Sequence, residues 1–277
     1  MSMLDNGTIG VFDSGFGGLT VLRALTERMP QARFVFVGDT ARLPYGSKSR
    51  RTVARYATES AQFLVREQGA AFVVIACNTA SALALDAIKD AVPAPVLGVI
   101  EPGAQAARGA SKTGDVLVIA TDATVQSHAY AEACGALGLR AMEKACPLLV
   151  PLVEEGWISH AVTEEVVRVY LGELRAEAAA RGMDADTLVL GCTHYPLLRP
   201  VIEKVLAEGA GRAMRVIDSA ESTAEAAARL FAVKSEGAIA ETEIRCFATD
   251  SVEKFERLGS RFLGRPVGKV ELIDLGG

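Results

Sequence analysis

Two segments of this chain share one design, and that repeat constrains the fold more than any other feature. Residues 72–79 read FVVIACNT and residues 187–194 read TLVLGCTH. In each segment an apolar run ends in a small residue, a cysteine and two polar residues. Short runs rich in Val, Ile and Leu are typical of strands buried on both faces of a parallel sheet. Each segment therefore predicts a parallel strand that ends at a cysteine, Cys77 in the first and Cys192 in the second.

A helical pattern follows each cysteine, over 80–89 and 197–206. Open α/β sheets bind their ligands at the edge where parallel strands end and helices begin. The plain alternative is that each cysteine is a small buried hydrophobic residue. That alternative does not need the polar residues Asn78-Thr79 and Thr193-His194 beside them, so we favour a functional role for both cysteines.

Strand and helix patterns alternate along the whole chain, which predicts an α/β protein with mostly parallel sheets. The other expected strands are 8–12, 33–37, 96–100, 115–120, 139–144, 214–217, 243–248 and 268–272. The apolar segment 145–156 is expected to be a loop, in which Glu154 either faces a cleft or is simply solvated. Because the cysteine unit is repeated, we expect two similar layered domains that face each other, each with one cysteine in a shared cleft.

Composition narrows the function classes. The chain has 277 residues, 50% of them hydrophobic, which is enough for two domains of ordinary size. The net charge of −5 provides no basic surface for nucleic acid, and no apolar run reaches the roughly 18 residues of a membrane span. The first ten residues do not resemble a signal peptide. Five cysteines without a CxxC pair indicate free thiols in a reducing cytoplasm.

The turn after the first strand reads DSGFGG over 13–18. It begins like a dinucleotide fingerprint, but Thr20 occupies the third glycine position, so we reject a nucleotide site. A glycine-rich turn that opens a helix presents backbone N–H groups to an anion. Asp13 and Ser14 either bind such an anion or only cap the helix.

Two further strand ends carry candidate binding residues. The loop 38–49 contains the turn Pro44-Tyr45-Gly46 and is either a plain surface connection or a binding loop. Thr121 follows the expected strand 115–120, in the position that Ser14 has after the first strand. Cys192 and His194 have the chemistry of metal ligands, but the sequence offers no further pair at ligand spacing, so we expect no metal site.

Two thiols on opposite sides of a tetrahedral carbon suggest one particular chemistry. One thiolate removes a proton from one face, and the other thiol delivers a proton to the opposite face, so the carbon is inverted without a cofactor. The pKa of a cysteine is easily tuned at a helix N-terminus or beside charged groups, so a thiolate can serve as the base.

Taken together, the motifs closely resemble the bacterial glutamate racemases, in the superfamily of cofactor-independent amino-acid racemases. The similarity covers nearly the whole chain and rests on residues 13–18, 38–46, 76–81, 150–154 and 191–197. It implies an isomerase that interconverts L- and D-glutamate and supplies D-glutamate for peptidoglycan. It also implies a cytoplasmic homodimer that needs no cofactor.

The resemblance implies a role for each site residue. Cys77 and Cys192 would be the two acid/bases, Asp13 would assist Cys77, and His194 and Glu154 would assist Cys192. The substrate would be held by Asp13, Ser14, Tyr45, Gly46, Asn78, Thr79, Thr121, Thr193 and His194. The implied fold has two α/β domains related by a pseudo-twofold axis, with the active site in the cleft between them. The first would comprise 1–98 and 212–277 and the second 99–211, with the chain returning near Gly211.

Three other functions stay open at this point. Aspartate racemases belong to the same superfamily, although the Pro44-Tyr45-Gly46 loop and the Thr193-His194 pair favour glutamate. A non-catalytic module that binds or inhibits gyrase would not need both cysteines, and a cysteine hydrolase would leave one of them unexplained. Members activated by a cell-wall nucleotide precursor carry a longer segment before the Asp13 motif, so we do not expect that control here.

Overall fold

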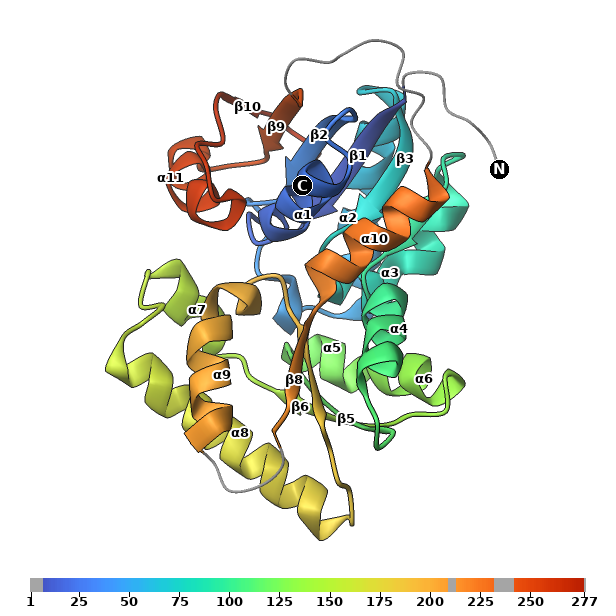
Figure 1. The fold of residues 1–277 in the computed structure, drawn as a ribbon. Coiled ribbons are helices and arrows are strands. Elements are labelled where there is room, and N and C mark those ends of the chain that lie inside the picture. The colour runs from blue at the N-terminus through green and yellow to red at the C-terminus, as the bar shows by residue number, and fades with distance from the viewer. Residues whose placement is uncertain (1–6, 209–212, 232–241, 277) are drawn as a thin grey trace. The chain divides into compact units, whose positions relative to one another are not determined.

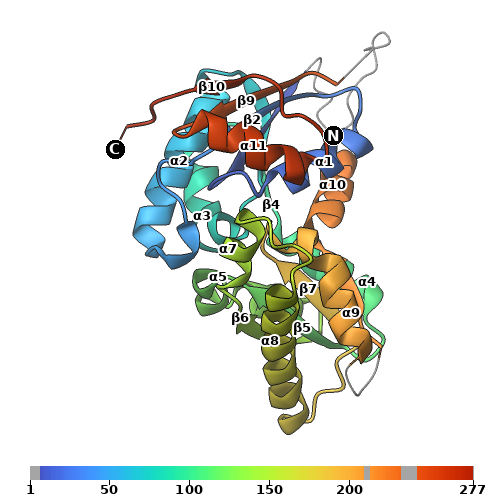
Figure 2. The ribbon, with the colours of Figure 1, turned by 90° about the vertical axis from the view of Figure 1, so that its left-hand side faces the viewer.

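The computed structural model describes residues 7–208, 213–231 and 242–276. Strands and helices alternate along the chain (Figures 1 and 2), as the sequence predicts. The chain divides into two compact units, one formed by Met1–Val99 with Ala220–Gly277 and the other by Ile100–Ser219. Each unit contains one parallel sheet, which confirms the predicted fold class. Within the described ranges, no helix is both long and apolar enough to span a membrane.

The first unit is built on a six-stranded sheet in the order β10-β9-β2-β1-β3-β4, in which every neighbouring pair is parallel. The strands are β1 (Thr8–Asp13), β2 (Arg33–Gly38), β3 (Ala70–Ile75), β4 (Val96–Gly98), β9 (Ile244–Ala248) and β10 (Val270–Leu272). The register pairs Asp13 with Gly38 and Phe12 with Ile75. The carboxyl ends of β2, β1 and β3 are therefore level at one edge.

Helices cover both faces of this sheet. They are α1 (Leu19–Arg28), α2 (Arg50–Arg66), α3 (Asn78–Ala91), α10 (Ser219–Leu230) and α11 (Val252–Leu263), with the short 3₁₀ helix η1 (Tyr45–Ser47) after β2. Helices α2 and α3 pack together on one face, while α1 packs against α11 on the other (Figure 2). The two faces follow from the alternation of strand side chains, since Val35 and Val37 contact the α2/α3 side and Phe36 meets Phe255 of α11.

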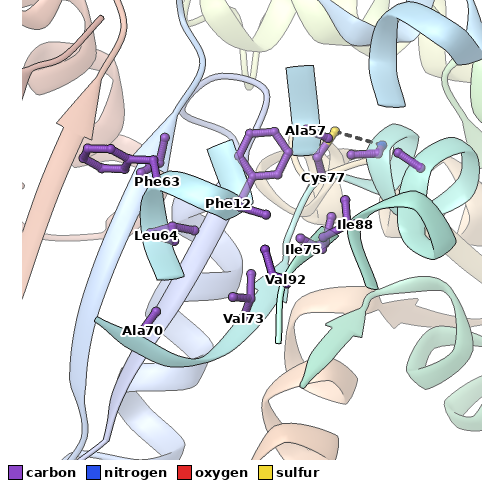
Figure 3. Close-up of a cluster of buried hydrophobic side chains, with 14 of the residues drawn as sticks. Phe12, Ala57, Phe63, Leu64, Ala70, Val73, Ile75, Cys77, Ile88 and Val92 are labelled. Carbon is purple, nitrogen blue, oxygen red and sulfur yellow. Dashed lines mark hydrogen bonds between the residues drawn. The ribbon is translucent and has the colours of Figure 1, made fainter. Parts of the chain in front are cut away.

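The core on the α2/α3 side extends as far as Cys77 (Figure 3). Phe12, Val73 and Ile75 project from the sheet toward apolar side chains of both helices. Burying one such side chain contributes about 1.5–3 kcal/mol. Because these residues directly precede the strand ends, the core fixes the positions of the polar residues that follow them.

The second unit is built on a four-stranded parallel sheet in the order β6-β5-β7-β8. Its strands are β5 (Asp115–Ala120), β6 (Arg140–Ala145), β7 (Thr187–Gly191) and β8 (Arg215–Asp218). Its helices are α4 (Ile100–Ala110), α5 (Asp122–Ser127), α6 (Ala129–Ala136), α7 (Leu149–Glu154), α8 (Ala161–Ala180), η2 (Tyr195–Leu198) and α9 (Arg199–Glu208). Helix α4 packs with α6, and α8 packs with α9, on opposite faces of the sheet (Figure 1).

The structure differs from the sequence predictions at the starts of two helices and at the return of the chain to the first unit. Helix α4 begins at Ile100, where the sequence predicted the end of a strand. Helix α7 occupies part of the expected loop 145–156. The chain leaves the second unit at Ala220, because β8 pairs with β7, whereas the sequence placed the return near Gly211, which lies outside the described residues.

Candidate active site

Cys77 follows β3 and caps α3, so the predicted junction of strand, cysteine and helix is present. Its sulfur accepts a hydrogen bond from the backbone N–H of Ala80 at 3.4 Å (Figure 3). Its thiol donates to Oγ of Ser14 at 3.4 Å. The side chain is only 5% exposed. The ends of β1 and β3 therefore bring Ser14 and Cys77 into direct contact.

Burial, followed by the nearby Asp13 carboxylate, raises the pKa of the Cys77 thiol to about 11. Hydrogen bonds with Ser14 and the Ala80 N–H act in the opposite direction, because they stabilise the thiolate. The positive end of α3 favours a thiolate as well. Cys77 is therefore a thiol at neutral pH in the unliganded protein, and the groups that would support its ionised form are already in contact with it.

Asp13, the last residue of β1, packs closely against the turn that follows the strand. Its Oδ2 accepts a hydrogen bond from the Gly15 N–H at 3.0 Å, and the residue is almost fully buried. A Cβ added at Gly18 would lie 2.5 Å from the Asp13 Cβ and 2.9 Å from that of Ala76. The glycine at position 18 is thus required by close packing, and this packing helps to hold Asp13 beside the end of β3.

The loop after β2 lies against the same turn. The N–H of Asp39 donates to the carbonyl of Asp13 at 3.0 Å. A Cβ at Gly38 would come within 2.1 Å of the Gly15 carbonyl oxygen. Tyr45 is buried and its hydroxyl donates to Asp39, so the side chain is not a free substrate ligand. Tyr45 and Gly46 are the first two residues of the 3₁₀ helix η1.

Asn78 and Thr79 are the first two residues of α3 and are both buried. Together with Asp13, Ser14 and Cys77 they complete the group that the sequence assigned to the first unit. Strand ends and helix starts at one sheet edge account for this convergence.

Cys192 follows β7 in the second unit and is also 5% exposed. The neighbouring strand β5 ends level with it, since Ala120 pairs with Gly191. Thr121, the next residue, shares a 2.9 Å hydrogen bond with Thr124 between their hydroxyl groups. The sequence analysis named Thr121 but not Thr124, which only the first turn of α5 brings beside it.

His194 and Glu154 are in contact, with Nε2 of the ring 3.4 Å from Oε1 of the carboxyl group. Nδ1 of the same ring lies 3.4 Å from Oγ1 of Thr193. Glu154 is the last residue of α7, a helix that the sequence did not predict. This helix therefore positions the carboxylate beside His194, close to the end of β7. In the second unit, a histidine two residues after the cysteine therefore contacts a carboxylate from α7.

Tyr195 is a residue that the sequence analysis missed. Its buried hydroxyl lies 3.1 Å from the carbonyl oxygen of Ala120 and 2.8 Å from that of Cys146. It thereby joins the ends of β5 and β6 to the segment that carries Cys192. A tyrosine directly after the Cys-Thr-His motif was the only signal in the sequence.

Over the described ranges, no group of three or more His, Cys, Asp and Glu residues has the geometry to hold a metal ion. The side chains at the two strand ends carry thiols, carboxylates, hydroxyls and an imidazole.

Comparison with known proteins agrees with this chemistry. The family model described as Asp/Glu/Hydantoin racemase matches residues 19–227. The chain belongs to the Asp/Glu/Hydantoin racemase family. A glutamate racemase of Koribacter versatilis is 51% identical over 97% of this chain and 98% of its own length.

Solved structures of racemases match nearly the whole chain. The glutamate racemase of Francisella tularensis, in complex with D-glutamate, has a TM-score of 0.84 at 33% identity and covers 98% of this chain and 99% of its own. The enzyme of Thermus thermophilus, in complex with β-chloro-D-alanine, has a TM-score of 0.83 at 43% identity with the same coverage. The racemase fold therefore extends over both units.

The packing of Gly18 against Asp13 gives a first prediction. Gly18→Ala forces a Cβ into atoms that cannot move without shifting the end of β1. Overpacking of this kind costs about 1–3 kcal/mol, so we expect the free energy of unfolding to fall by that amount. Urea unfolding followed by circular dichroism measures it.

Gly172→Ala is the matched control. Gly172 lies inside α8 with open space around the position of a Cβ. Replacing a glycine in a helix by alanine gains up to about 1 kcal/mol. If Gly18→Ala unfolded no more readily than the parent, the close contact with Asp13 would not be a constraint on this turn.

Proposed function

We propose that the protein is a glutamate racemase that interconverts L- and D-glutamate by two-base chemistry without a cofactor. The observation that carries the proposal is the recurrence of one arrangement, a nearly buried cysteine within two residues of the end of a parallel strand, in each of two α/β units. Groups that can assist proton transfer accompany both: Asp13 lies near enough to Cys77 to raise its pKa, and His194, which contacts Glu154, lies two residues after Cys192.

The two cysteines divide the reaction between them. One thiolate takes the proton from Cα of glutamate, and the thiol of the other cysteine gives a proton to the opposite face. The electron pair left on Cα is held for that moment by the adjacent carboxylate and then forms the new C–H bond. The chemistry requires both thiols to reach one Cα, and each is restored when the reverse reaction runs.

Neighbouring groups tune these transfers. Asp13 acts on Cys77, while His194, oriented by Thr193 and Glu154, acts on Cys192. Hydrogen-bonding residues at the strand ends hold the substrate: Asp13, Ser14, Asn78, Thr79, Thr121, Thr193, His194 and the backbone of Tyr45 and Gly46. Helix α3 also directs its positive end toward this edge, which suits a bound carboxylate.

The proposal predicts loss of optical rotation from L-glutamate and from D-glutamate, with L-aspartate unchanged or far slower. In D₂O the product carries deuterium at Cα, because a thiol proton exchanges with solvent. Activity survives EDTA and needs no pyridoxal phosphate. Faster racemisation of aspartate would favour the aspartate racemase alternative, and the absence of racemisation of either amino acid would favour a non-catalytic binding role.

The biological setting belongs to the same proposal. D-Glutamate made here would supply peptidoglycan synthesis in the cytoplasm. All five cysteines are free, which suits a reducing compartment. The resemblance also implies a homodimer, and sedimentation equilibrium tests it by measuring the mass of the protein in solution.

A further inference from the structure

Asp39 and Arg42, in the loop after β2, form a charged cluster that takes no part in the proposed proton transfers. Asp39, at the centre of the cluster, is completely buried. Its carboxylate accepts hydrogen bonds from the Tyr45 hydroxyl, from Nε of Arg42 at 2.8 Å and from Oγ1 of Thr249 at 2.9 Å. A buried carboxylate with three donors is costly to rearrange, because any lost donor leaves charge unpaired.

Arg42 extends the cluster to distant parts of the first unit. Its side chain is only 10% exposed, and Nη1 donates to Glu59 of α2 and to the carbonyl of Gly276, the latter at 3.2 Å. The guanidinium also lies over the ring of Tyr56, 4.2 Å from its centroid. Arg42 therefore anchors the loop to α2 and to the segment that follows β10.

Backbone contacts fix the start of the loop as well. Oγ1 of Thr249 accepts from the N–H of Ala41 at 2.9 Å, and the N–H of Asp250 donates to Oγ1 of Thr40 at 2.9 Å. These contacts tie the loop to the end of β9, and the bond from the Asp39 N–H to Asp13 ties it to the end of β1. The loop is thus attached to two neighbouring strand ends.

Tyr45 connects the loop to the region of the Cys77 thiol. It belongs to the same core cluster as Cys77, and η1 packs against α3. The tyrosine hydroxyl is not available to a substrate, because it is bonded to Asp39. The position of its ring decides where the backbone of Tyr45 and Gly46 lies relative to Cys77.

We infer that Asp39 and Arg42 are positioning residues of the racemase site, which hold Tyr45 by its hydroxyl and so fix the backbone of Tyr45 and Gly46 for substrate binding. This inference rests on the proposed function, which assigns that backbone to the substrate. Neither Asp39 nor Arg42 touches the substrate in this scheme, and the Tyr45 side chain is a tether.

Tyr45→Phe tests the inference by removing only the hydroxyl. We expect KM for both enantiomers to rise about tenfold, as for the loss of a hydrogen bond to a charged group. The turnover number should change less than about twofold, because a backbone contact made equally in the ground state and the transition state affects KM alone. Asp39→Asn should act in the same direction, since it removes the charge that holds both Tyr45 and Arg42.

Asp186→Asn is the matched control. Asp186 is a buried carboxylate in the second unit that accepts from Oγ of Ser111 and the N–H groups of Lys112 and Thr113. It precedes β7, at the end of that strand opposite to Cys192. We expect both Asp186→Asn and Asp39→Asn to lower Tm, because each weakens the hydrogen bonds of a buried carboxylate, but only Asp39→Asn to raise KM.

Amide hydrogen exchange gives a readout that does not depend on activity. Peptides covering 43–49 should exchange faster in Tyr45→Phe and Asp39→Asn than in the parent or in Asp186→Asn. Either of two results in a folded Tyr45→Phe protein would overturn the positioning role. One is an unchanged KM, whatever the exchange rate. The other is an unchanged exchange rate of the peptides covering 43–49. A parent protein that does not racemise glutamate would instead refute the proposed function, and the exchange of 43–49 would then still show whether the tether holds the loop.

Discussion

Cys77→Ser and Cys192→Ser are each expected to reduce glutamate racemisation to near zero. A serine hydroxyl is a far weaker acid than a thiol, so each variant lacks a working base on one face of Cα. Racemisation in either direction uses one cysteine as base and the other as acid, so losing either stops both directions. General acid–base groups contribute about 10²–10⁴-fold each, and we expect a loss at the upper end of that range. A polarimetric assay with both enantiomers measures it.

An elimination reaction separates the two cysteines. A glutamate analogue with chloride on Cβ loses the Cα proton and then chloride, so it needs only one base. Each variant should eliminate chloride from one enantiomer of the analogue and hardly from the other, and the preferred enantiomer should be opposite in the two variants. By the resemblance, Cys77 deprotonates the D form and Cys192 the L form. The same preference in both variants would refute the two-thiol mechanism.

Cys246→Ser provides the matched control for these substitutions. Cys246 is equally buried, in β9, where burial raises its pKa to about 12. The proposal gives it no chemical role. Its variant should lose stability, because a hydroxyl replaces a buried thiol, while the racemase activity of the folded protein persists.

Asp13→Asn is expected to slow racemisation about 10²–10³-fold while making Cys77 more acidic. The Asp13 carboxylate raises the pKa of Cys77 above what burial alone would give. Removing that negative charge lowers the pKa from about 11, so at pH 8 a larger fraction of Cys77 is thiolate. Alkylation of Cys77 by iodoacetamide, followed by mass spectrometry between pH 7 and 10, should therefore become faster.

Opposite changes in the two measurements distinguish a chemical role of Asp13 from a structural one. Asparagine can still accept the hydrogen bond from the Gly15 N–H, so the turn should keep its shape. Ser14→Ala gives the reverse electrostatic change, because the hydrogen bond with Ser14 lowers the pKa of Cys77, and its loss should slow alkylation. Slower alkylation in Asp13→Asn would contradict the assigned effect of its charge.

The sequence predicted most accurately the elements whose signal is local. Strand β5 (Asp115–Ala120) has the predicted bounds, Cys192 directly follows β7, and Cys77 lies two residues after the end of β3. Apolar runs that end in small and polar residues are sufficient for this, because a buried parallel strand leaves few other interpretations.

Helices that contain proline were harder to predict. Pro102 lies in the first turn of α4 and Pro151 in the first turn of α7, where a missing N–H costs little. The sequence analysis instead predicted a strand as far as residue 100 and a loop over 145–156. Helix α11 has apolar residues at helical spacing, such as Phe255, Leu258 and Phe262, but the sequence analysis did not assign it.

The candidate site was predictable only in its residue types. Strand ends bring Asp13, Ser14 and Cys77 together, as the pattern indicated. The bonds of Asp39 and Arg42 to Thr249 and Gly276 join residues more than 200 positions apart, and no local spacing reveals them. The hydrogen bond from the Tyr45 hydroxyl to Asp39 is of the same kind, because no local spacing indicates that a residue predicted to bind substrate has this partner.

The discontinuous first unit has a consequence for synthesis on the ribosome. Strands β1 to β4 emerge first and form a partial sheet whose outer edge is β2. The strand that covers this edge, β9, is made only after the whole second unit. Until then the N–H and C=O groups along β2 are open to pairing with another nascent chain. The time needed to translate Ile100–Ser219 is thus an interval in which the growing polypeptide is exposed to aggregation, and in which chaperones have an edge to protect.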